Sequence, residues 1–134
     1  MKSIITFLTL VTIGTSCDSY NPVDYNIINN SSKEIKVIFN QWEYDQGMYI
    51  TNDTIVSIAP HQKENLLIRE IIGASVWNPE TGNDTIWAIN KLEIFRDDTI
   101  LVNKNFRMMN YWQYNNLGRH HAELNLVLKD QDIF

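Results

Sequence analysis

The sequence predicts an all-β protein, an antiparallel β-sandwich of about seven short strands. Several short segments alternate apolar with polar residues, as strands with one buried face do. Turn-forming residues separate these segments, and no stretch has the apolar spacing of a convincing amphipathic helix. The contents of 44% hydrophobic and 20% charged residues are typical of a globular chain. A small closed β-barrel is the main alternative arrangement of the same strands.

The first two strands are predicted from residues 23–27 and 35–39. The first segment alternates apolar with polar residues, and the second is rich in β-branched residues. The polar residues 29–32 interrupt the pattern between them, so the two segments are expected to form a hairpin. Because side chains alternate along a strand, the odd-numbered residues from Ile35 to Phe39 share one face.

The middle of the chain predicts a loop and two further strands. Residues 41–52 are polar and aromatic and predict a loop, whereas the β-branched residues of 54–58 predict a strand. Pro60 turns the chain, because proline lacks the donor that a central strand needs. Residues 66–71 fit either two strand faces or one short helical face, and we favour a strand that ends at Gly73.

The second half begins with a long loop and ends on the clearest strand. Residues 75–84 contain proline, glycine and asparagine and predict the loop. An alternating strand follows at 87–95, and a tight turn at 96–99 leads into a strand at 100–102. The Asp-Asp pair in this turn is weaker than Asp-Gly, because its second position prefers glycine. Residues 122–128 alternate leucines and alanine with mainly polar residues, as a half-buried strand does.

The first sixteen residues predict an export signal. Lys2 supplies a positive start, residues 4–13 are apolar except for three threonines, and Gly14-Thr15-Ser16 supplies small residues. The apolar run is roughly ten residues long, and a helix that spans a bilayer needs about 20. A permanent transmembrane anchor is therefore not expected.

Cys17 follows these small residues and is the chain's one cysteine, so it has no partner for an internal disulfide. The stretch resembles a bacterial lipoprotein signal, although Gly14 stands where that family usually has leucine. The resemblance implies that residues 1–16 are removed and that Cys17 is lipidated on its sulfur and usually acylated on its new amino terminus. Several acyl chains anchor a protein essentially permanently to a membrane. The alternative is an incidental thiol beside an ordinary signal-peptidase site.

The rest of the chain resembles small, uncharacterised envelope lipoproteins of the Bacteroidota. The resemblance rests on the segment from Tyr25 to Phe39, on residues 84–102 with their Asp-Asp turn, and on a last strand followed by an acidic tail at 129–132. It implies an immunoglobulin-like sandwich without implying an activity. The length of the chain and the polar residues after Cys17 predict a short tether at 17–22 and a single domain at 23–134. We expect lipid anchoring in the cell envelope, at the outer membrane rather than the inner one. A formal charge of −5 is poorly suited to nucleic acid.

Two aromatic stretches are candidate binding surfaces. Residues 106–114 include Tyr111, Trp112 and Tyr114 beside arginine and amide side chains, which suit sugar rings or a protein partner. Trp42 belongs to a second aromatic stretch, in the expected loop. The alternative for both is that the rings are buried and cover an open end or edge of the sandwich. The binding interpretation gains if both stretches lie at one end.

Neither a metal site nor an active site is predicted. His120 and His121 are adjacent, so on a strand they face opposite sides and cannot easily bind one ion. Glycine-flanked serine and phosphate-binding motifs are lacking in the sequence. We expect a non-catalytic binding module with no cofactor except the lipid on Cys17. The alternatives are a purely structural lipoprotein and a small hydrolase.

The tripeptide Asp-Thr-Ile occurs three times, with its threonine at Thr54, Thr85 and Thr99. It resembles the acceptor pattern of general O-glycosylation in the Bacteroidota. The same residues also suit the entry to a strand, since aspartate ends a turn and Thr-Ile begins a pleat. The two interpretations can hold together.

Overall fold

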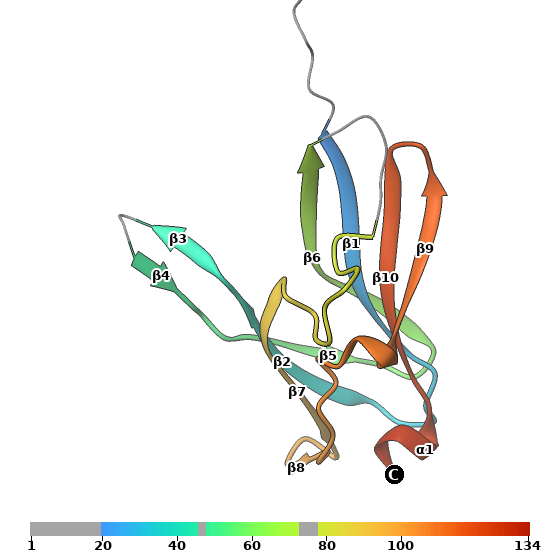
Figure 1. Ribbon diagram of the computed structural model, residues 1–134. Helices are drawn as coiled ribbons and strands as arrows, with labels where there is room; N and C mark the ends of the chain where they lie inside the picture. Colours follow the sequence, from blue (N-terminus) through green and yellow to red (C-terminus); the bar gives the residue numbers. More distant parts are fainter. Residues whose placement is uncertain (1–19, 46–47, 73–77) are drawn as a thin grey trace, which may run out of the picture.

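The computed structural model contains two four-stranded β-sheets that pack together (Figure 1). The structure describes residues 20–45, 48–72 and 78–134. The strand orders are β6-β1-β10-β9 and β5-β2-β7-β8. The elements are β1 (Tyr20–Asn29), β2 (Ile35–Gln41), β3 (Glu43–Asp45), β4 (Met48–Ile50), β5 (Thr54–Ile58), β6 (Gln62–Ile72), β7 (Ile89–Arg96), β8 (Ile100–Leu101), η1 (Met109–Tyr111), β9 (Trp112–Gly118), β10 (His121–Leu128) and α1 (Asp130–Ile133). The predicted all-β sandwich is confirmed.

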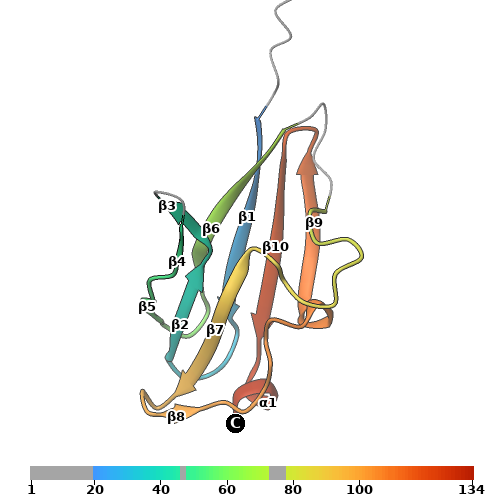
Figure 2. The ribbon, with the colours of Figure 1, turned by 60° about the vertical axis from the view of Figure 1, so that its left-hand side comes forward.

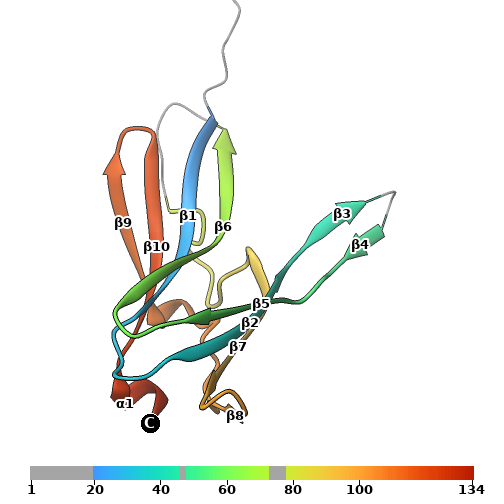
Figure 3. The same cartoon turned by 180° about the vertical axis from the view of Figure 1, so that it is seen from behind.

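The first strand occupies the middle of its sheet. β1 pairs antiparallel with β6 on one side and parallel with β10 on the other, with Val23 opposite Ala122 and Asn29 opposite Leu128. Figure 3 shows these strands side by side from behind. The sequence predicted a wholly antiparallel sandwich, but the structure contains this one parallel pair among its described strands. A parallel pair needs a long connection, and here almost the whole chain lies between its two strands.

The predicted hairpin of residues 23–27 with 35–39 is wrong, because β1 and β2 lie in different sheets. Each strand buries one face. The two buried faces pack against each other in the core, and the strands do not pair edge to edge. Asn29 fixes the crossing between the sheets. Its side-chain amide donates to the carbonyl oxygens of Lys33 and Ile58, each at 2.8 Å.

The core is built from alternate residues of the strands. β10 confirms the predicted alternation, since its apolar residues at even-numbered positions are all buried. β2 buries the face that its sequence predicts. The inward residues of these two strands are Ala122, Leu124, Leu126 and Leu128 from β10, and Ile35, Val37 and Phe39 from β2.

The loop predicted at residues 41–52 is wrong in part, because β3 and β4 form a two-stranded ribbon with Tyr44 opposite Tyr49. β2 and β5 pair antiparallel, and the chain runs from one to the other through this ribbon. Figures 1 and 3 show the ribbon projecting away from both sheets. Trp42, between β2 and β3, therefore lies at its base.

The predicted turn between β7 and β8 is confirmed. Asp97 and Asp98 both have positive φ, 48° and 61°, and lie in the three-residue connection between Arg96 and Ile100, which pair with each other. Aspartate tolerates this conformation better than most residues with a side chain. The strand favoured for residues 66–71 is also confirmed within β6, while its predicted end at Gly73 lies outside the described residues.

Candidate functional site

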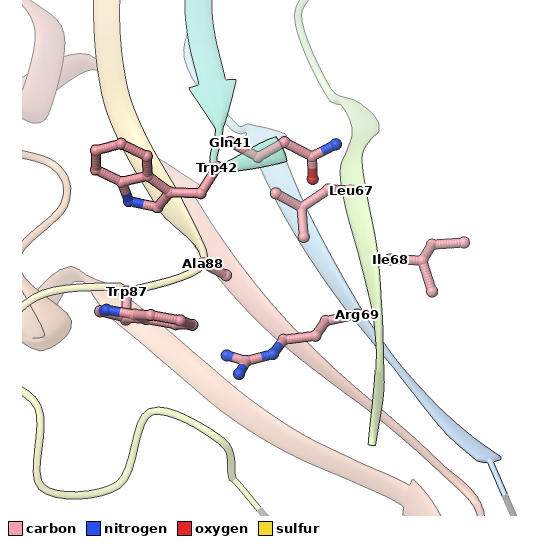
Figure 4. Close-up of a pocket in the computed structure, with 7 residues that line it drawn as sticks. All are labelled: Gln41, Trp42, Leu67, Ile68, Arg69, Trp87 and Ala88. Atoms are coloured by element: carbon pink, nitrogen blue, oxygen red, sulfur yellow. The ribbon is translucent and has the colours of Figure 1, made fainter. Parts of the chain in front are cut away.

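A pocket of about 230 Å3 lies between β6 of one sheet and the neighbouring ends of β2 and β7 in the other. Figure 2 shows β6 beside β2 and β7 in a turned view. The pocket is lined by Gln41, Trp42, Leu67, Ile68, Arg69, Trp87 and Ala88 (Figure 4). These residues come from three distant segments of the chain, so the pocket exists only when the domain is folded.

Glu80 contacts two of these segments, those of Arg69 and Trp87, and its side chain is completely buried. Its Oε1 atom accepts hydrogen bonds from the Tyr25 hydroxyl at 2.9 Å and the Ala88 backbone N–H at 3.2 Å. Its Oε2 atom accepts from the Trp87 backbone N–H at 2.8 Å and the Asn83 side chain at 3.1 Å. A buried carboxylate requires such donors, because desolvating an unpaired charge costs several kcal/mol. Glu80 thereby holds the segment before β7 against β1.

Tyr25 is the partner of Glu80 on β1. Burial, followed by the charge of the neighbouring Glu80 and its hydrogen bond, raises the pKa of the Tyr25 hydroxyl well above its ordinary value. The hydroxyl therefore stays protonated and donates to the carboxylate throughout the physiological pH range.

Arg69 brings a positive charge into the pocket from an inward position of β6, between Leu67 and Ile71. Its Nη1 atom lies 3.9 Å from Oε1 of Glu80, and its guanidinium carbon lies 5.0 Å from the centre of the Trp87 ring. The side chain is still 37% exposed. The ion pair and the cation–π contact restrict the guanidinium, which has five N–H donors and does not use them all on Glu80.

Two tryptophans complete the pocket with large exposed surfaces. Trp42 is 47% exposed and Trp87 is 60% exposed. In Figure 4 both rings lie on the same side of the pocket, the Arg69 guanidinium points toward Trp87, and Ile68 points away from the others. Indole rings offer a large, rigid contact area with one hydrogen-bond donor.

The described lining of the pocket is mainly apolar, with one cation. Of the described residues that line the pocket, none is a serine, cysteine, histidine or carboxylic acid. Glu80 lies behind this lining, and both of its oxygens already accept hydrogen bonds from protein donors. The pocket therefore presents two flat apolar surfaces and a restricted cation.

Trp112, a predicted ligand contact, belongs to the core instead. It is 6% exposed, its indole N–H donates to the Phe106 carbonyl oxygen at 2.8 Å, and its ring lies 6.3 Å from that of Tyr25. It is the first residue of β9, where it points between the sheets. The structure therefore favours the buried alternative for Trp112.

Tyr111 and Tyr114, predicted from the same stretch, are half-buried. The Tyr111 ring packs 5.4 Å from Phe106. The Tyr114 hydroxyl is buried with no hydrogen-bond partner among the described residues, and burial raises its pKa. The described lining of the Trp42 pocket includes no residue from 106–114, so the two aromatic stretches do not share that site.

The two histidines have separate partners. Nδ1 of His120 lies 2.8 Å from the Asn21 side-chain oxygen, and Nε2 of His121 lies 2.8 Å from a carboxylate oxygen of Asp24. Within residues 20–45, 48–72 and 78–134, no group of three or more histidine, cysteine or acidic residues is placed to hold a metal ion. In the acidic tail, Asp130 accepts hydrogen bonds from the backbone and hydroxyl of Ser32.

The three candidate glycosylation sites differ in exposure. Thr54 begins β5 and is exposed, Thr99 is exposed in the β7–β8 turn, and Thr85 is half-buried in an isolated bridge with Met108. Thr54 also fits the strand-entry interpretation, since it is the first residue of its strand.

The aspartate before Thr54 has a local structural role. Asp53 accepts hydrogen bonds from Lys91 and Asn40, each at 2.7 Å. These bonds, that of Lys91 first, lower the pKa of its carboxyl group.

Of the residues at this pocket, the sequence singled out Trp42 and missed Arg69, Glu80 and Trp87. Arg69 had a usable signal, because a charge on the apolar side of a strand pattern indicates a buried or partly buried partner. Glu80 had none, since it lies in a predicted loop 55 residues from Tyr25. Trp87 was placed in a strand, but β7 begins only at Ile89, which leaves the indole exposed.

Cys17 and the predicted leader at 1–16 lie outside the described residues. Among the residues that the structure does describe, no helix has the length and apolarity required to cross a membrane. Comparison of the chain with protein-family models, curated proteins and solved structures finds no match.

Proposed function

We propose that the protein is a non-catalytic binding module of the bacterial envelope, anchored by a lipid on Cys17, and that the pocket around Arg69 is its contact site. The observation that carries the proposal is the pair of exposed indoles, Trp42 and Trp87, beside a cation that the buried Glu80 restrains.

Two energetic features support a binding role over a purely structural one. Large exposed indoles leave apolar surface in water that a core would bury, so they do not contribute fully to folding. A buried carboxylate is also often no more stabilising than apolar residues of similar size. Glu80 nevertheless fixes the backbone of Trp87 and faces Arg69, which prearranges two groups of the pocket. Prearrangement lowers the entropy cost of binding a ligand.

The anchor is supported by the export signal, the single Cys17 and the resemblance to Bacteroidota lipoproteins. Tyr20, the first residue of β1, follows Cys17 by three residues, so its Cα atom lies within about 11 Å of that of the lipidated residue. The domain therefore stays close to the membrane surface, which we propose to be the outer membrane. Glycans on Thr54, Thr85 and Thr99 are compatible with this location.

A structural lipoprotein without a ligand is the second candidate, because Trp112 of the densest aromatic stretch is buried in the core. Affinity capture from the native envelope separates the two. The wild-type chain should retain a component that the Trp42→Ala/Trp87→Ala double variant loses, with Tyr20→Ala as the control at an exposed aromatic residue outside the pocket. Equal capture by all three chains would favour the structural role.

The anchor has an independent test. The intact mass of the membrane-extracted protein should correspond to a chain that begins at a lipid-modified Cys17, and Cys17→Ser should release the protein from the membrane. An unmodified terminus would refute the anchor and leave the pocket proposal unaffected.

A further inference from the structure

The charge at the pocket is balanced. Arg69 is the one charged residue among the described residues that line it, and its guanidinium faces the buried carboxylate of Glu80 at 3.9 Å. A phosphate or a free carboxylate would have to approach Arg69, which is already paired with Glu80, and would come close to the negative charge of Glu80. Bringing two like charges close together at a contact is unfavourable. The balance therefore favours an uncharged ligand.

The size of the pocket limits what enters it. Its volume of about 230 Å3 lies below the roughly 300–1,000 Å3 of sites that enclose drug-sized molecules. One six-membered ring can enter, while the rest of a chain stays outside.

The surface chemistry selects the kind of ring. A pyranose has an apolar face of C–H groups and a rim of hydroxyls, so it needs a flat apolar surface together with donors and acceptors at its edge. Trp42 and Trp87 supply flat surfaces, and Leu67 and Ala88 add apolar contact. The Arg69 guanidinium and the indole N–H groups supply donors.

From charge, size and chemistry together we infer that the pocket binds one ring of a neutral saccharide chain. The ring stacks on an indole face, and Arg69 donates to its hydroxyls. The inference rests on the proposed binding function and assigns its ligand class.

A protein partner fits this site less well. A specific protein interface covers about 800 Å2 on each partner and is built around a continuous core of contacts. In Figure 4 the exposed Ile68 points away from the two indoles, so it does not extend their apolar surface. A small hollow with a balanced charge suits a single ring better than an extended surface.

The test is isothermal titration of the purified full chain, in detergent, with neutral hexasaccharides of glucose, mannose and xylose and with acidic hexagalacturonate. At least one neutral hexasaccharide should bind. Trp42→Ala and Trp87→Ala should each lower the affinity for that hexasaccharide at least about tenfold. Tyr20→Ala, which removes an exposed aromatic ring outside the pocket, should not change the affinity. Hexagalacturonate should bind no tighter, and added salt should have little effect on the neutral ligand.

A second measurement does not depend on variants. In the wild-type chain, the indole N–H resonances of Trp42 and Trp87 should shift during the titration, whereas that of the buried Trp112 should not. The inference is overturned if none of the neutral chains binds, if hexagalacturonate binds more tightly, or if binding survives both tryptophan variants. If the envelope capture yields a protein that depends on Trp42 and Trp87 while no saccharide binds, the binding function stands and the ligand class fails. If neither assay depends on these residues, both fail.

Discussion

Replacing Glu80 by glutamine tests the residue on which the arrangement of the pocket depends. Each carboxylate oxygen accepts a hydrogen bond from a backbone N–H, that of Ala88 or of Trp87, so either orientation of the new amide turns its NH2 group toward a group that can only donate. A hydrogen bond to a charged group contributes about 1.5–3 kcal/mol, and a buried donor left without an acceptor costs about 1–3 kcal/mol. We therefore expect Glu80→Gln to lower the free energy of unfolding by about 3–5 kcal/mol, which is a large part of the roughly 5–15 kcal/mol typical of a domain.

The measurement is urea unfolding followed by tryptophan fluorescence, with an unchanged slope against urea as the sign that the folded state is intact. Glu64→Gln is the matched control, because Glu64 is exposed on β6 and should change stability by less than about 0.5 kcal/mol. Tyr25→Phe should cost less than Glu80→Gln, and its effect should largely disappear in the double variant, because the two side chains share one hydrogen bond. If Glu80→Gln falls within about 1 kcal/mol of the control, Glu80 does not organise this region.

Three further predictions concern other parts of the domain. Because the pKa of Tyr25 is higher in the folded state, the unfolded chain loses this proton first, so stability should fall above pH of about 10, and Tyr25→Phe should reduce that fall in alkaline unfolding experiments. Asp98→Gly should stabilise the domain by about 0.5–1 kcal/mol in thermal unfolding, because φ is 61° there and glycine adopts it without strain; a loss of stability would contradict the turn geometry. The pKa of Glu123 is lowered, and the hydrogen bond from Lys63 is the largest cause. The pair therefore contributes to stability above the ordinary pKa of the carboxyl group, and this contribution is lost as the pH falls. Lys63→Met should therefore raise that pKa in a carbon-detected NMR titration, and an unchanged value would exclude the pairing.

The strands could be predicted from the sequence where one face is buried and the other is wet. β10 and β2 are examples, because their inward residues recur at every second position and need no knowledge of the partner strand. β5 was found for a related reason, since its β-branched residues stand between polar turns.

The pairing of the strands could not be predicted in the same way. Alternation shows that β1 has an inward face but not whether β2 or β10 lies beside it. The predicted hairpin assumed that strands adjacent in sequence also pair in one sheet. β1 and β2 instead lie in different sheets, and the apolar face of each packs into the core between them. β3 and β4 were missed because their residues show no apolar alternation.

The site was less accessible than the fold. Trp42 was selected from composition, but its neighbours in the pocket are Leu67 and Trp87, which only the packing of two sheets brings together. Trp112 was selected by the same criterion and is in the core. Aromatic density alone does not separate exposed rings from buried ones, because both kinds of position favour large side chains.

The position of β1 between β6 and β10 affects the order in which the domain can form. Asn26 of β1 and its neighbour Asn125 of β10 are 99 residues apart, so at about 5–20 residues per second the ribosome completes the second roughly 5–20 s after the first. During that time one edge of β1 has no partner, and the core that Val23, Tyr25 and Ile27 enter is unfinished. The sheet around β1 is completed only when β10, the last long strand, has been synthesised. Such a delay would suit the export that we propose for the chain.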